Sequence, residues 1–145
     1  MKTIEISIAK DDIYKELERL TSYLGSRHPT SEPGKEEAQF RRVASCETDN
    51  PLLDRYFHQA IATLTERLKD YVEKSATTGG IFAMSLNVSE AYDDSRPALL
   101  TGAVASFLTA SLARDWLRIT MPDESALYES EANRLITECE RRRCH

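Results

Sequence analysis

Residues 97–113 read PALLTGAVASFLTASLA, and this uncharged stretch decides how the rest of the chain must fold. Its apolar side chains recur at helical spacing and continue to Trp116 and Leu117, which predicts a helix over residues 97–119. The stretch is shorter than the roughly 20 residues that span a bilayer. It also contains several hydroxyl side chains and runs directly into Arg114 and Asp115. We therefore expect the buried central helix of a soluble protein rather than a membrane span.

Small side chains recur every four residues along this helix, at Gly102, Ser106 and Ala110. Such a row lets the backbone of a second helix approach closely. Two interpretations stay open. The row is either a packing groove within one molecule, which we favour, or part of a contact between subunits.

Three further helices are predicted on either side of the central one. The apolar spacing places them over residues 12–24, 51–75 and 123–142. The second opens with Asn50-Pro51, because Asn is a preferred N-cap and Pro is tolerated in the first helical turn. Together with residues 97–119, these segments predict a bundle of about four long helices.

Two segments alternate between apolar and other side chains, which is typical of half-buried strands. Ile4, Ile6 and Ile8 define a strand over residues 3–9, and a similar pattern defines a second strand over residues 81–89. With only two predicted strands, we expect them to pair as a small β ribbon over the helices, in a direction that the sequence leaves open. The predicted fold class is mainly α, with a two-stranded ribbon.

The overall composition predicts one domain over residues 1–145. Residues 26–50 are expected to form an irregular loop, with a candidate short helix over residues 35–44. The net charge of −5 argues against a dedicated nucleic-acid binder, which usually needs a basic surface. Glu5 and Ser7 interrupt the apolar N-terminus, so we expect no secretion signal and a cytoplasmic protein with reduced cysteines.

No residue pattern points to catalysis, a cofactor or a bound metal. His58 has no carboxylate or cysteine three or four residues further along its helix, where Ile61 and Ala62 stand, and Cys139, Cys144 and His145 lack zinc-site spacing. The acidic pair Asp93-Asp94 sits at a predicted helix start, where capping explains it. We therefore expect a protein that is not an enzyme and has no catalytic, cofactor or metal site.

Two segments resemble a known family. Residues 48–57, TDNPLLDRYF, lead into a long amphipathic helix, and residues 99–116 form an apolar helix followed by Pro122 and by YESEA at residues 128–132. Together they resemble the small head–tail connector (neck adaptor) proteins of tailed phages and their prophages. The opening strand and helix are also similar to small prophage proteins of gut anaerobes.

This resemblance implies a non-enzymatic structural or assembly protein. We expect first a subunit of the neck ring, and a minor tail or head-completion protein fits nearly as well. Its partners would be further copies of itself, in a ring or other homo-oligomer, and portal or tail proteins, first in the host cytoplasm and then in the virion. Ring subunits need head-to-tail contacts that close. The candidate subunit interface consists of Ile4, Ile6, Ile8, Gly102, Ser106 and Ala110.

A helical binding or regulatory module is the main alternative. It predicts a cavity between helices 51–75 and 97–119, lined by Phe57, Leu64, Phe107 and Trp116. An enzyme would instead require polar groups that converge around His58, Asp93 and Asp94. A nucleic-acid binder is the remaining alternative.

Overall fold

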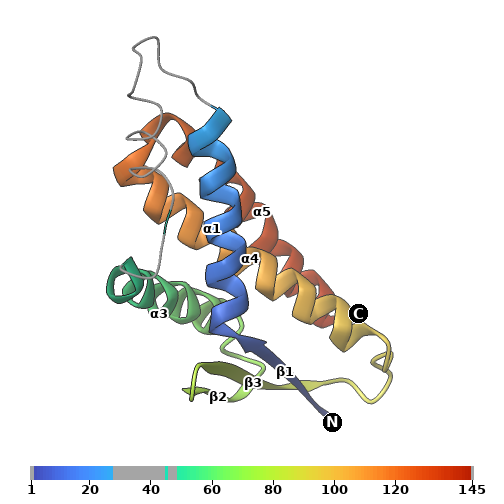
Figure 1. Ribbon diagram of the computed structural model, residues 1–145. Coiled ribbons are helices and arrows are strands. Elements are labelled where there is room, and N and C mark those ends of the chain that lie inside the picture. The colour runs from blue at the N-terminus through green and yellow to red at the C-terminus, as the bar shows by residue number, and fades with distance from the viewer. Residues whose placement is uncertain (1, 28–44, 46–48, 145) are drawn as a thin grey trace, which may run out of the picture.

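The computed structural model describes residues 2–27, 45 and 49–144 (Figure 1). The candidate helix over residues 35–44 and most of the expected 26–50 loop lie outside these residues. The protein is mainly helical, as the sequence predicts, and it contains a small antiparallel sheet. The elements in chain order are β1 (Lys2–Ala9), α1 (Lys10–Arg27), α3 (Asn50–Arg67), β2 (Val72–Thr78), β3 (Ile81–Val88), α4 (Arg96–Thr120) and α5 (Pro122–Cys144).

Helix α4 is the centre of the fold, and it packs against α1, α3, α5 and β1. Figure 1 shows α1, α4 and α5 as the long body of the molecule, with α3 and the sheet towards one end. Most of the large apolar side chains of α4 are completely or almost completely buried, and Leu99 and Ile119 near its two ends are exposed. The buried side chains include Leu100, Val104, Phe107, Leu108, Leu112, Trp116 and Leu117.

The two predicted strands pair with each other, and the structure gives their direction as antiparallel. Ile4 lies opposite Leu86, Ile6 opposite Met84, and Ile8 opposite Phe82. All six side chains are buried, because they lie on the face of the sheet that meets the helices. The other face carries mostly small and polar side chains, including Thr3, Glu5, Ser7, Ser85 and Asn87.

The predicted two-stranded ribbon is wrong, because a third strand extends the sheet in the order β1-β3-β2. Helix α3 ends at Arg67 rather than near residue 75, and β2 occupies residues that the apolar spacing assigns to the helix. Gly79 and Gly80 join β2 to β3 with φ values of +59° and +79°. Positive φ at both central residues makes the tight hairpin turn whose twist matches paired strands, and glycine adopts it without steric cost.

Tyr92, in the turn before α4, holds both ends of the described chain. Its backbone oxygen accepts a hydrogen bond from Lys2 Nζ, and its hydroxyl donates to the backbone oxygen of Arg142 at 2.8 Å. Lys2 also forms an ion pair with Asp94 at 2.7 Å. Strand β1, the turn and the end of α5 are therefore tied together.

By length and composition alone, α4 is apolar enough to cross a membrane, and it is the one helix of the described residues that meets this test. Core helices of soluble proteins meet it equally well. Here 44% of the most apolar part of α4 is buried inside the protein. Its packing on every neighbouring helix accounts for its apolar composition.

Candidate functional site

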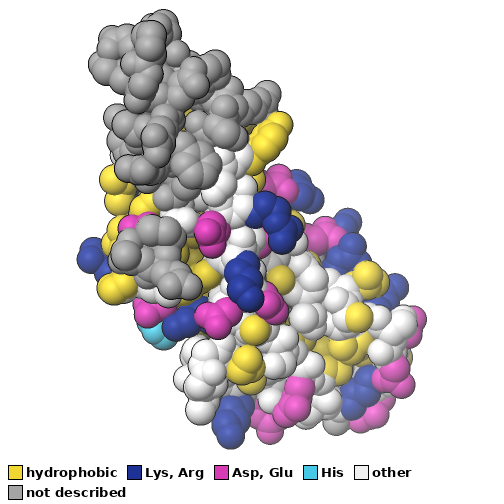
Figure 2. All heavy atoms as spheres, in the orientation of Figure 1, with side chains coloured by type: hydrophobic (Ala, Val, Ile, Leu, Met, Phe, Trp, Pro, Cys, Tyr) yellow, Lys and Arg dark blue, Asp and Glu magenta, His cyan; other side chains and the backbone are white. Residues whose placement is uncertain are grey.

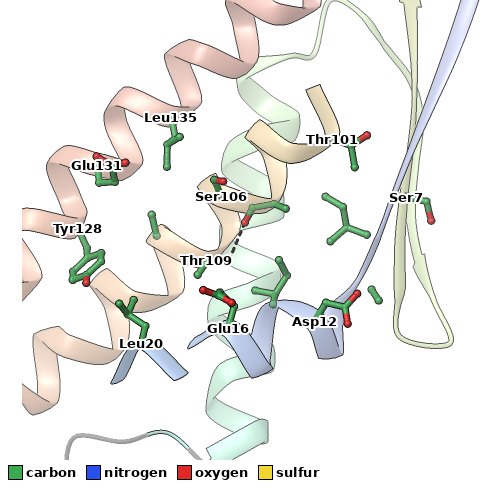
Figure 3. A pocket seen from close by; sticks show the side chains of 15 residues that line it. Ser7, Asp12, Glu16, Leu20, Thr101, Ser106, Thr109, Tyr128, Glu131 and Leu135 are labelled. Carbon is green, nitrogen blue, oxygen red and sulfur yellow. Dashed lines mark hydrogen bonds between the residues drawn. The ribbon is translucent and has the colours of Figure 1, made fainter. Parts of the chain in front are cut away.

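A groove of about 550 Å³ lies over α4, between α1 and α5 (Figure 3). One end of it reaches β1. The residues that line it are Ser7, Ile8, Ala9, Asp12, Ile13, Glu16, Leu20, Thr101, Ala105, Ser106, Thr109, Ala110, Tyr128, Glu131 and Leu135. We call this hollow, defined by these residues, the α4 groove.

The walls of the α4 groove are two helix faces. Asp12, Glu16 and Leu20 stand one turn apart along α1, and Figure 3 shows them on one side of α4. Tyr128, Glu131 and Leu135 stand about one turn apart along α5, on another side of the groove. Residues three or four apart share a helix face, so both walls run lengthwise for about two turns.

The floor of the α4 groove is made of side chains no larger than threonine. Thr101 donates a hydrogen bond to the backbone oxygen of Pro97 at 2.8 Å. Thr109 donates in the same way to Ala105 at 3.0 Å, the bond drawn in Figure 3. Because the hydroxyl donors of Thr101 and Thr109 are satisfied within α4, these two residues offer an occupant mainly their methyl groups, and Ser106 adds one exposed hydroxyl to the floor.

All carboxylates of the α4 groove lie on its walls, and among the described residues no Lys or Arg lines it. Glu16 pairs with Arg19 at 2.9 Å and Glu131 with Arg134, in both cases one turn along the same exposed helix surface. The hydrogen bond from Arg134 lowers the pKa of Glu131. Such exposed pairs contribute little energy, so they leave both acids able to meet a new cation.

The surroundings of Tyr128 reflect this negative charge. Its pKa is raised, first because the ring is partly buried and then because Glu124 and Glu131 oppose ionisation of the phenol. Asp12, on the opposite wall, has no ion pair within the described part of the chain. The α4 groove thus combines a shallow apolar floor with acidic walls.

The structure divides the candidate interface residues between two environments. Ile4, Ile6 and Ile8 are at most 8% exposed and belong to the core, so their side chains are covered by the protein's own helices. Gly102 and Ser106 are exposed, whereas Ala110 is buried. Ser106 and Ala110 lie on the floor of the α4 groove, and Gly102 borders a smaller hollow beside it. Whether either set forms a subunit interface stays a prediction.

A second polar cluster, not expected from the sequence, links α1 to α3. Lys10 Nζ lies 3.0 Å from Asp54, and the Tyr14 hydroxyl donates a hydrogen bond to the same carboxylate. Burial alone would raise the pKa of Asp54, but these two donors outweigh it and hold the value below its ordinary range. The Tyr14 ring packs edge-on against Phe57, with ring centres 6.2 Å apart. These contacts join α1 to α3, and the two halves of the cluster are about 40 residues apart in the sequence, so no spacing rule could find it.

The residues considered for catalysis do not converge. His58 is exposed on α3. Asp93 instead accepts hydrogen bonds from Ser95 in the turn before α4, and Asp94 pairs with Lys2. No group of three or more His, Cys, Asp or Glu side chains that could hold a metal ion occurs in the described ranges. Burial raises the pKa of the Cys139 thiol to about 12, so it is protonated at neutral pH.

Phe57, Leu64, Phe107 and Trp116, the expected lining of a cavity between two helices, are all packed in the core. The α4 groove lies on a different side of the central helix and none of the four lines it. Figure 2 shows acidic and basic side chains intermixed over the face in view, with apolar side chains between them.

No protein-family model matches the sequence, and comparison with curated proteins and with solved structures found no significant match.

Proposed function

We propose that this protein is a non-enzymatic structural or assembly protein of a tailed phage or prophage, acting as a head–tail connector ring subunit. In this role it would form a ring or other homo-oligomer and contact portal or tail proteins. It would assemble in the host cytoplasm and remain in the virion. The family resemblance of residues 48–57 and 99–132 supports the phage assignment, and the sheet supports self-assembly.

The observation that carries the proposal is that the sheet ends in two different edge strands. Strand β3 pairs with β1 on one side and β2 on the other, so the outer edges of β1 and β2 face away from each other. Edge strands present unpaired backbone groups to which another chain can add. A ring requires two different surfaces that join head to tail, and one molecule of this protein offers such a pair.

The hydrogen-bond pattern shows which backbone groups of β1 are available. Lys10 N–H donates to the Gly80 oxygen at 2.8 Å, just beyond the end of the β1–β3 ladder. In an antiparallel pair, the N–H groups of one strand point alternately toward and away from the partner. The N–H groups of Ile4, Ile6 and Ile8 therefore point toward β3, and those of Thr3, Glu5 and Ser7 point outward.

This alternation allows a sharp test. Glu5→Pro removes an outward donor without removing a β1–β3 hydrogen bond, and proline is tolerated on edge strands. Glu5→Thr is the matched control, because it removes the same charge and keeps the N–H. Native mass spectrometry and light scattering over a range of concentrations should show an oligomer for the parent protein and for Glu5→Thr, and smaller species for Glu5→Pro.

The phage assignment has its own test, which is independent of the edge strand. The gene should lie between portal, capsid and tail genes, and purified protein should bind the portal encoded beside it. A strict monomer that binds no portal protein, encoded away from any phage genes, would contradict the proposal.

A helical binding or regulatory module is the second candidate, and the α4 groove is the observation that favours it. An apolar concave surface with a few placed polar groups is typical of binding sites. A monomer that binds a ligand in this groove would support the second candidate over the first.

A further inference from the structure

We infer that the α4 groove is a docking site for one amphipathic helix of a partner protein, with basic side chains that face the acidic walls. The inference goes beyond the assembly role and does not depend on it, because the groove lies mainly between helices and meets the β1 edge only at its end, around Ser7. It rests on the shape of the groove, the size of its floor residues and the sign of its charge.

The shape of the groove fits a helix. Asp12 to Leu20 covers nine residues of α1, a length of about 12 Å at the helical rise, and the faces of α4 and α5 accompany it. Helix α4 packs against α3 and β1 as well as against α1 and α5, and the groove lies over α4 between α1 and α5. A fourth helix placed there would complete a four-helix arrangement around the floor of α4.

The floor permits a close approach. Ala105, Ser106, Thr109 and Ala110 fill little space, and a methyl group added at nearby Gly102 would meet no atom within 4 Å. Ile8, Ile13 and Leu135 supply apolar surface below the walls. An occupant helix would therefore turn small or medium apolar residues toward α4.

The charge selects a basic partner. The carboxylates of Asp12 and Glu16 stand on one wall and that of Glu131 on the other, with no cation among the lining residues that the structure describes. Glu16 and Glu131 have exposed arginine partners outside the groove, Arg19 and Arg134. Lys or Arg side chains on both flanks of an occupant helix would reach these acids while their methylene stems cover Leu20 and Tyr128. Charge complementarity of this kind determines which partners bind and how fast they associate.

A selection experiment tests the inference while the partner is still unidentified. The library displays helical peptides about three turns long, in which each position is randomised among apolar, basic and acidic residues. It is selected against the immobilised full-length protein. We expect enrichment of peptides with small or apolar residues at i, i+3/i+4 and i+7 and with Lys or Arg beside them. Enrichment of acidic or extended peptides, or of none, would overturn the inference.

Matched variants then locate the site. Ser106→Trp fills the floor and should abolish binding of an enriched peptide, whereas Thr137→Trp, on the exposed surface of α5 outside the groove, should not. Asp12→Lys should weaken binding about threefold or more at low salt, and by less at about 0.5 M salt. Asp11→Lys is its control, because it makes the same charge change in the same helical turn but lies outside the groove.

Circular dichroism of every variant excludes loss of folding as the cause. Equal effects of Asp11→Lys and Asp12→Lys would show that net charge, not the groove, determines binding, and would overturn the inference. So would unchanged binding to Ser106→Trp. Two further results count against it: a small polyamine such as spermidine occupying the groove in preference to any peptide, or the enriched peptides matching a segment of this chain, which would make the occupant a second copy.

Discussion

The two sides of α4 differ in what they present. On one side, large side chains such as Leu108 and Leu112 are fully buried against the sheet and neighbouring helices. On the other side, Gly102, Ser106 and Thr109 leave a shallow surface that is still partly open. One helix therefore both builds the core and forms the floor of the α4 groove. The apolar composition of α4 therefore serves the core. Its open side differs from the packed side by having small side chains rather than by being more hydrophobic.

The largest expected effect is on the packed side. Leu108→Ala should lower the free energy of unfolding by about 2–5 kcal/mol, because Leu108 is completely buried and its loss leaves a cavity. Chemical denaturation measures the change. Leu99→Ala is the control on the same helix. Because Leu99 is 51% exposed, this substitution should lower the free energy of unfolding far less. An equal loss of unfolding free energy at both positions would contradict the difference between the two sides of α4.

The second prediction concerns a polar group on the packed side. Ser111 is 1% exposed, and its hydroxyl has no hydrogen-bond partner within the described part of the protein. Ser111→Ala should raise the free energy of unfolding by about 1 kcal/mol, because a buried unpaired hydroxyl is costly and alanine favours helix. Destabilisation by Ser111→Ala would show that the hydroxyl has a partner which the single chain lacks.

A smaller gain is expected on the open side. Gly102→Ala should stabilise the protein by about 0.5–1 kcal/mol, because alanine is the better helix former and its methyl group meets no atom within 4 Å. The thermal midpoint in dilute and concentrated solution tests this. Stabilisation that disappears at high concentration would indicate that this position contacts a second molecule.

The smallest effect at neutral pH concerns Cys139, on the face of α5 that packs inward. Its pKa of about 12 compares with an ordinary value of 9.0, because burial disfavours the thiolate. The thiol therefore adds no pH dependence to stability below pH 9, and stability should fall between about pH 9 and pH 12 as the unfolded chain releases the proton first. In a variant with Cys46→Ser and Cys144→Ser, native protein should react with a thiol reagent only as fast as it unfolds. Rapid reaction at pH 8 would contradict this burial.

Much of the fold could be predicted from periodicity alone. The central helix, expected over residues 97–119, spans Arg96–Thr120, and the last helix, expected over residues 123–142, spans Pro122–Cys144. The pairing of β1 with β3 also follows the sequence pattern, since Ile4, Ile6 and Ile8 alternate along β1 and lie opposite the alternating side chains of β3. These elements bury continuous apolar faces, and a buried face appears in the sequence as apolar residues at regular spacing.

Strand β2 escaped prediction because its pattern is weak. Its side chains are exposed or half-buried, so alternation carries little signal, and Tyr71 and Val72 happen to continue the apolar stripe of α3. The clue in the sequence was Gly79-Gly80 between Thr77-Thr78 and Ile81, because two glycines between β-branched residues indicate a tight hairpin. The same glycines also fit the end of a helix, and the apolar stripe favoured that interpretation.

The α4 groove could be predicted only in part. Two members of the small-residue row, Ser106 and Ala110, lie on its floor, and Gly102 lies just outside it. Its acidic walls come from α1 and α5, more than 100 residues apart in the sequence for Asp12 and Glu131. Their approach is a product of tertiary packing, which no local pattern records.

Tyr92 has a mechanical consequence. Because one side chain and its backbone oxygen hold both Lys2 and the Arg142 backbone, tension applied between the two ends of the described chain would first load this tyrosine. The β1–β3 ladder, in which Lys2 lies opposite Val88, would share this load. In an assembly that carries load between two larger parts, Tyr92 would act as the first link to yield, and Tyr92→Phe would lower the force at which the ends separate.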